Sequence, residues 1–161
     1  MPPKTSCGIL LYRKNQKDEY EFFIGHPGGP FWKYKEKGAW SIPKGEIEEG
    51  EVDLLNVAKR EFEEEMGVKF DKRNLDEFIY LGSVKQSSGK IVHAFAIEDD
   101  GEWPGFFLKQ HFIDIEFPPK SGKKIKIPEI DKAGFYKEEI AKIKINLAQK
   151  DFIDRLKKIQ S

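Results

Sequence analysis

The 161-residue sequence predicts one α/β domain, in which β-strands are arranged around two helices. Three observations predict this class. Short apolar and β-branched runs are bounded by turn residues, and two longer segments repeat their apolar residues with helical spacing. The length suits one hydrophobic core and leaves little room for two. Because no internal repeat, low-complexity tract or long linker divides the chain, we expect residues 1–161 to form a single domain.

Five runs have the composition of strands. In chain order they are Ser6–Arg13, Tyr20–Gly25, Phe78–Gln86, Lys90–Ile97 and Phe112–Phe117. The segment Ser87-Ser88-Gly89, between the third and fourth runs, is typical of a hairpin turn. The fifth run ends at Pro118-Pro119, because proline cannot donate to a strand ladder.

Two segments are predicted to be helical. The first spans Asp53–Met66, with Asp53 as the N-terminal cap and Gly67 as the stop. The second spans Asn146–Ile159, with Asn146 as the cap. Its apolar side is formed by Phe152, Ile153, Leu156 and Ile159.

The composition excludes several classes of protein. With 39% apolar and 13% aromatic residues, the chain is too hydrophobic to be disordered. It has 28 Lys and Arg against 28 Asp and Glu, so its formal net charge is zero. Since proteins that bind nucleic acids usually carry a basic excess, no long nucleic-acid partner is expected.

The cysteine content and the first residues of the chain indicate in which cellular compartment the protein is expected. The single cysteine, Cys7, cannot form an internal disulfide, which suits a reducing cytoplasm. With only Cys7 and three scattered histidines, no zinc motif can be assembled. Residues 1–4 lack the apolar run of a signal peptide, and no stretch is long and apolar enough to span a membrane. We therefore expect a cytoplasmic protein that does not bind a membrane. The sequence leaves open whether the protein forms a homodimer.

The zero net charge conceals a strongly uneven distribution. Residues 46–65 carry nine acidic and two basic groups, whereas residues 1–45 and 118–161 carry net charges of +4 and +6. The acidic stretch is either a solvated helix face or a place that holds a cation. The loops 26–37 and 118–124 are rich in lysine, and they either keep the domain soluble or surround an anion-binding site.

The geometry of the first helix groups three carboxylates. At about 100° per residue, Glu61, Glu64 and Glu65 share an arc of about 100°, and Glu63 points to the far side, where we expect it to be solvated. An apolar stripe lies beside this arc, and Leu54 and Val57 project into the arc itself, so the acidic cluster is confined to the last turns of the helix. The stripe is formed by Leu55, Ala58, Phe62 and Met66.

Carboxylates this close repel one another unless a positive charge compensates them. Hard oxygen ligands of this kind suit Mg²⁺ or Mn²⁺. The alternative is an exposed glutamate-rich helix that binds nothing.

The stretch from Gly45 to Val68 reads G-E-I-E-E-G-E-V-D-L-L-N-V-A-K-R-E-F-E-E-E-M-G-V. It closely resembles the signature of the Nudix hydrolases, G-x5-E-x7-R-E-U-x-E-E-x-G-U with U apolar. Gly45 and Glu51 match its first part, and residues 60–68 match every specified position of the second. Eight residues instead of seven separate Glu51 from Arg60. We expect the extra residue to lie at the loop–helix junction, where it puts the position of Glu51 in question.

The resemblance implies a Nudix fold, with a mixed β-sheet sandwiched between helices, and hydrolysis of a nucleoside diphosphate derivative with Mg²⁺ or Mn²⁺. The metal ligands it implies are Glu61, Glu64 and Glu65, with the Gly45 carbonyl as a further ligand. Glu61 or Glu64 would act as the base. Arg60 would orient these carboxylates or pair with the supporting Glu51. The alternative is a Nudix-fold module that binds a nucleotide without cleaving it, although such modules typically lose box glutamates.

Residues outside the signature supply further candidates. Lys44 and the lysines of loop 33–37 are expected to support substrate phosphates as point charges. Many relatives use another acidic residue from a later loop, and here the candidates are Glu98, Glu102 and, favoured by its place before a turn, Glu116. Trp32, Trp103 and Phe106 are candidates for stacking on a base. Nucleoside triphosphates, dinucleoside polyphosphates and nucleotide sugars all remain open as substrates.

Overall fold

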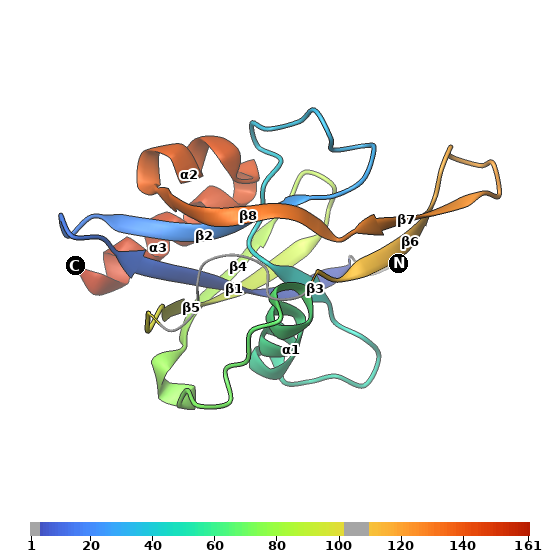
Figure 1. Cartoon of the computed structure of the whole chain (residues 1–161). Helices are drawn as coiled ribbons and strands as arrows, with labels where there is room; N and C mark the ends of the chain where they lie inside the picture. The colour runs from blue at the N-terminus through green and yellow to red at the C-terminus, as the bar shows by residue number, and fades with distance from the viewer. Residues whose placement is uncertain (1–3, 102–109) are drawn as a thin grey trace.

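The computed structural model describes residues 4–101 and 110–161, and its centre is a mixed six-stranded sheet (Figure 1). Five strands follow one another across the sheet in the order β4 (Ile79–Lys85), β5 (Ile91–Glu98), β1 (Thr5–Lys14), β2 (Tyr20–Pro27) and β8 (Ile130–Lys137). The β1–β5 pair is parallel and the other pairs are antiparallel. Seven consecutive residues of β1 are buried, as expected for a strand covered on both faces.

One edge of strand β1 pairs with β5, and the other edge pairs with two different strands. Its end, Tyr12–Lys14, pairs with β2, and its beginning, Ser6–Gly8, pairs with the short strand β3 (Lys44–Glu46). The approach of β3 depends on Gly8, because a Cβ there would lie 2.5 Å from the Pro43 oxygen. Residues 43–46 are thereby brought against the sheet.

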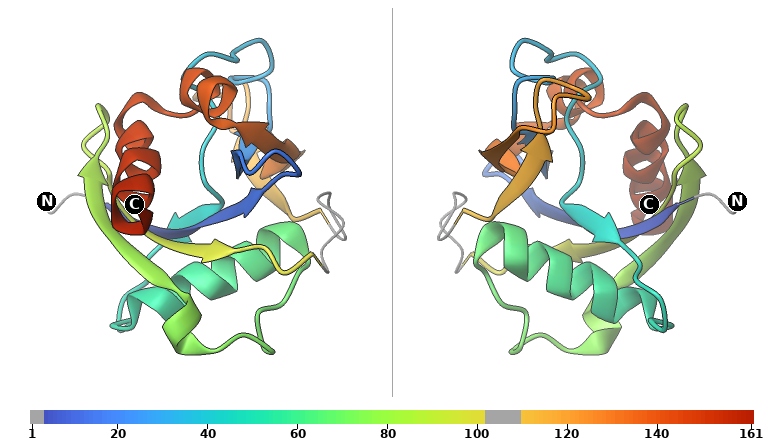
Figure 2. Two further views of the ribbon diagram at one scale, coloured as in Figure 1. Left: turned by 90° about the vertical axis from the view of Figure 1, so that its left-hand side faces the viewer. Right: turned by 90° about the vertical axis from the view of Figure 1, so that its right-hand side faces the viewer.

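Helices cover both faces of the sheet (Figure 2). Helix α1 (Leu54–Met66) packs on one face with the apolar side chains of one core cluster. Helices α2 (Glu138–Lys144) and α3 (Lys150–Gln160) pack on the other face with a second cluster. Among the described residues, no helix is long and apolar enough to cross a membrane.

The caps of α1 are those predicted. The Asp53 carboxylate accepts from the Asn56 backbone N–H at 3.1 Å, and Gly67 has the left-handed φ of 73° that suits glycine. Val57 shares one helical row with Glu61 and Glu65, as predicted, and this row is more buried than expected, with Val57 2% exposed. The helix therefore turns more of its Val57–Glu61–Glu65 row inward than its sequence indicated.

All five predicted strands are confirmed, including β6 (Phe112–Glu116), and Gln86 and Lys90 close the predicted hairpin. The second predicted helix is wrong at its beginning, whereas its end lies within one residue of the prediction, because α3 ends at Gln160. Asn146 caps a 3₁₀ turn (η2, Leu147–Gln149) before α3 begins, and Ile159 is 54% exposed. Three strands and one α-helix were not predicted: β3, β7 (Lys124–Pro128), β8 and α2. A short 3₁₀ turn, η1 (Leu75–Glu77), precedes β4.

Cys7 lies in the core beneath α1 and supplies a test of the packing. Burial, and secondarily the charge of Glu51, raises the pKa of the Cys7 thiol to about 11. At pH 8 the thiolate fraction is therefore about one in a thousand. We expect no rapid reaction of the native protein with a disulfide reagent such as DTNB, and release of one equivalent of chromophore in guanidinium chloride. Fast reaction of the native protein would contradict this packing.

Candidate functional site

Four segments meet where β3 joins β1: β3 itself, the loop 47–53, the second half of α1 and the start of β8 (Figure 1). Two adjoining hollows lie there, and neighbouring residues of β1 and β2 also line them. The smaller, of about 190 Å³, is lined by Gly25, Pro27, Ser41, Ile42, Lys44, Glu65, Glu129 and Ile130. The larger, of about 580 Å³, is lined by Ser6, Lys44, Gly45, Glu46, Ile47, Glu48, Glu49, Glu61, Lys90 and Glu129. Lys44 and Glu129 are common to both.

Arg60 joins the loop to the helix. Its guanidinium donates through both terminal nitrogens to the Glu51 carboxylate, and through Nη2 to Glu61 Oε1 at 3.2 Å. The Arg60 hydrogen bonds lower the pKa of Glu51, which also accepts from the Glu48 backbone N–H at 2.8 Å. The extra residue before Arg60 is thus accommodated without separating Arg60 from Glu51.

Glu61 lies directly against Gly45. A Cβ at Gly45 would overlap the Glu61 carboxyl group, so only glycine leaves room for it here. Burial raises the pKa of Glu61, and the neighbouring charges of Glu64 and Glu129 raise it further, against the opposing effect of Arg60. The first glycine of the motif and its first helix glutamate therefore form one contact.

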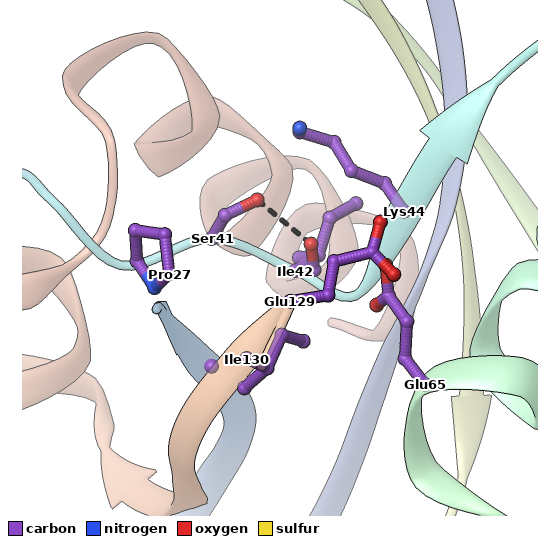
Figure 3. A pocket seen from close by; sticks show the side chains of 8 residues that line it. Pro27, Ser41, Ile42, Lys44, Glu65, Glu129 and Ile130 are labelled. Atoms are coloured by element: carbon purple, nitrogen blue, oxygen red, sulfur yellow. Dashed lines mark hydrogen bonds between the residues drawn. The ribbon is translucent and has the colours of Figure 1, made fainter. Parts of the chain in front are cut away.

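Glu65 is 3% exposed, and its Oε2 has no hydrogen-bond partner among the described residues. Burial raises the pKa of Glu65 well above its usual value, and the charge of Glu129 adds to the effect. Figure 3 shows the carboxyl groups of Glu65 and Glu129 directed toward one another. A buried acceptor without a donor is costly, and a bound cation would satisfy it.

Glu63 and Glu64, which precede Glu65 on α1, differ in their surroundings. Glu64 is exposed at the end of the helix. Glu63, which we expected to be solvated, is half-buried and accepts from the Phe70 backbone N–H at 2.9 Å. The correction has a simple cause: the chain turns back after Gly67 and brings residue 70 to that side of the helix.

Sequence reasoning missed Glu129, which immediately precedes β8. Its Oε2 is 2.8 Å from His111 Nδ1, and its backbone N–H donates to the His111 carbonyl at 2.9 Å. Its position beside Glu65 follows from the pairing of β8 with β2 across the sheet. An acidic residue directly before a strand was the available signal, but β8 itself was not predicted.

Two smaller contributions to the site were also missed. The buried Ser6 Oγ has no partner among the described residues and belongs to the larger hollow. Lys90, at the same hollow, forms an ion pair in which its Nζ lies 3.4 Å from Glu46 Oε1.

The acidic candidates outside the motif lie elsewhere. Glu116 accepts from the backbone N–H groups of Lys120 and Gly122, so it stabilises the turn of its own hairpin and lines neither hollow. In the register of β1 and β5, Glu98 lies opposite Tyr12, near the end of β1. Gly45 lies opposite Cys7, near the beginning of β1, so Glu98 is remote from the motif. Glu102, Trp103 and Phe106 lie outside the described residues.

Lys44 occupies the position between the hollows. Burial, and then the charge of Lys90, lowers the pKa of the Lys44 ammonium. Figure 3 shows the ammonium directed away from Glu65 and Glu129. The lysines of loop 33–37 and the ring of Trp32 line neither hollow.

The donor set fits a divalent cation chemically. Within residues 4–101 and 110–161, no three acidic, histidine or cysteine side chains already converge as a metal centre. Like charges repel, and Glu61 and Glu65 accordingly open to different hollows. The unpartnered Glu65 oxygen and the glycine that admits the Glu61 carboxylate are nevertheless features that Mg²⁺ or Mn²⁺ would use.

Comparisons with known proteins cover most of the chain. The model of the NUDIX domain matches residues 2–155. An uncharacterized 17.7 kDa protein of Enterobacteria phage T4, from the e-segB intergenic region, is 33% identical over 128 residues, which cover 80% of this chain and 79% of that protein.

Two solved structures share the fold. A C. elegans Ap4A hydrolase in a binary complex matches with a TM-score of 0.62 and 18% identity, over 98% of this chain and 97% of that one. The NUDIX domain of Shewanella oneidensis NrtR, complexed with ADP ribose, matches with a TM-score of 0.66 and 10% identity, over 100% and 90%.

Proposed function

The chain belongs to the Nudix family, and we propose that it is a divalent-metal-dependent hydrolase that cleaves the diphosphate linkage of a nucleoside diphosphate derivative and releases a nucleoside monophosphate. The observation that carries this proposal is the buried, unpartnered Glu65 oxygen beside an intact set of motif glutamates. Nucleoside triphosphates, dinucleoside polyphosphates and nucleotide sugars are the candidate substrates. The Ap4A hydrolase and the ADP-ribose complex among the similar structures fall within that range.

Glu61, Glu64 and Glu65 would hold the metal, with the Gly45 carbonyl and Glu129 as further ligands. When bound, Mg²⁺ or Mn²⁺ would neutralise phosphate charge and lower the pKa of a water molecule. The carboxylates alone would repel a diphosphate, so the proposal requires this cation.

The remaining residues position and compensate charge. Arg60 fixes the Glu61 carboxylate through its 3.2 Å hydrogen bond while Glu51 holds the other side of the guanidinium. Lys44 would attract a phosphate as a point charge, because its ammonium forms no ion pair with a described carboxylate. We assign the base to Glu64, which is exposed to water, because Glu61 already accepts from Arg60.

The test is a panel of the three substrate classes, incubated with the pure protein with and without Mg²⁺ and analysed by chromatography. The proposal expects a nucleoside monophosphate from at least one member, only when metal is present. No product from any member, together with thermal stabilisation by a nucleotide, would support the alternative of a non-catalytic nucleotide-binding module.

A further inference from the structure

The loop 28–38, between β2 and β3, is held in a fixed shape. The Gly28 N–H donates to the Glu129 carbonyl at 3.2 Å, and hydrogen-bonded turns follow at Trp32, Lys35 and Ala39. The buried ring of His26 contacts the Lys35 carbonyl through Nε2 at 2.6 Å. Side chains on this loop are therefore presented by an ordered backbone.

Large aromatic side chains on this loop face the solvent. Tyr34 is 87% exposed, Phe31 49% and Trp32 40%. A lysine ammonium lies over two of these rings: Lys33 is 5.4 Å from the Tyr34 centroid and Lys35 is 5.2 Å from that of Trp32. Exposed aromatic groups gathered on an ordered loop indicate an interaction surface.

The lysines of the loop keep their charge available. Lys33, Lys35 and Lys37 are exposed, and none forms an ion pair with a carboxylate in the described ranges. The one acidic residue among them, Glu36, is bound by Lys132 at 3.0 Å and by Lys144 at 3.3 Å. The Lys132 hydrogen bond lowers the pKa of Glu36 to about 2, so this carboxylate is ionised and already compensated.

The β6–β7 hairpin extends beside this loop (Figure 1; Figure 2). The Phe31 ring packs edge-on against Phe117, with centroids 5.6 Å apart. Lys120 and Lys123 extend from the tip and are likewise unpaired among the described residues. Lys124 and Lys126 lie opposite Glu116 and Asp114 in the hairpin register, and we leave them out of the surface.

We propose that this aromatic–lysine surface, formed by residues 31–37 with Lys120 and Lys123, binds single-stranded nucleic acid. Bases stack on exposed aromatic rings whatever their sequence, and neighbouring lysines neutralise the phosphates. A duplex hides its base faces, so it cannot use the rings in this way. The zero net charge of the whole chain argued against such a partner, but the single acidic residue within residues 31–37, Glu36, is already bound by Lys132 and Lys144, so this surface is locally positive.

The test uses fluorescein-labelled 20-nucleotide RNA and DNA with 5′-hydroxyl ends, in EDTA, and measures binding by anisotropy. These conditions leave no diphosphate to cleave, so the result is independent of the proposed hydrolysis. We expect the wild-type protein to bind. The double variant Lys33→Glu/Lys35→Glu should bind at least about tenfold more weakly and show a reduced dependence on salt. Tyr34→Ala should weaken binding severalfold with little change in that dependence.

The matched control is Lys69→Glu/Lys72→Glu, which makes the same charge change on the loop after α1, at the opposite side of the molecule (Figure 2). It should bind as the wild type does, and thermal melting should show all variants folded. The proposal is overturned if the wild type does not bind, if the control and the loop variants bind alike, or if vesicles containing phosphatidylserine are bound and the oligonucleotides are not.

Discussion

Replacing Glu64 by Gln is expected to lower the rate of hydrolysis by at least about 100-fold while leaving thermal unfolding unchanged. Glu64 is exposed at the end of α1, so the isosteric change disturbs no packing. Exposed substitutions of this kind alter stability by no more than about 0.5 kcal/mol. The loss would therefore report the role of the carboxylate as metal ligand and base. It is measured as turnover of whichever nucleotide the panel identifies.

The matched control is Glu63→Gln, one position earlier on the same helix. The Glu63 carboxylate accepts from the Phe70 N–H at 2.9 Å, and the Gln side-chain oxygen can still accept. This variant should retain near wild-type turnover. Equal activity in Glu64→Gln and Glu63→Gln would remove Glu64 from the mechanism.

Replacing Glu65 by Gln is expected to abolish turnover and also to stabilise the metal-free protein, by about 1 kcal/mol. Glu65 is 3% exposed with an unpartnered oxygen, and the charges of Glu129 and Glu61 oppose its ionisation. Gln has the same shape and does not ionise, so it avoids the cost of burying a charge and the repulsion by Glu129 and Glu61. For a chain of this length, the change corresponds to a rise in Tm of about 2–4 °C, measured by calorimetry in EDTA.

Metal should reverse this order of stability. Mg²⁺ is expected to raise the Tm of the wild-type protein and to leave that of Glu65→Gln almost unchanged, because the variant lacks the ligand. Glu64→Gln is the control for charge alone: it removes the same charge from an exposed position and should not stabilise the metal-free protein. If Glu65→Gln were less stable than the wild type in EDTA, the Glu65 carboxylate would have a favourable partner in the metal-free protein, and the expectation would be contradicted.

The parts of the fold that sequence could predict are those that depend on local chemistry. Helix α1 is bounded by Asp53 and Gly67, whose side-chain capping and left-handed φ are properties of the residues themselves. Strand β3 has three residues and exists because β1 pairs with it, so its own sequence carries little signal. Strand β8 and helix α2 are likewise stabilised by contacts with β2 that are distant in sequence.

The candidate site divides in the same way. The motif placed Glu61, Glu64 and Glu65 on one helix, and the Gly45–Glu61 contact joins its first glycine to that helix. Helical geometry gave the angle between these side chains but not the direction in which the sheet lies, so the burial of Glu65 was not foreseen. The place of Glu129 depends on how β8 crosses the sheet, which no local pattern encodes.

The central claim is that the buried glutamate of α1 belongs to a metal site, and the most direct test is Mn²⁺ binding followed by electron paramagnetic resonance. Titration of the wild-type protein should remove the signal of free Mn²⁺ at substoichiometric metal, and Glu63→Gln should behave in the same way. Glu65→Gln should bind at least about tenfold more weakly. If the wild-type protein leaves the free Mn²⁺ signal undiminished, or if Glu65→Gln binds Mn²⁺ as tightly as the wild type, the claim is contradicted.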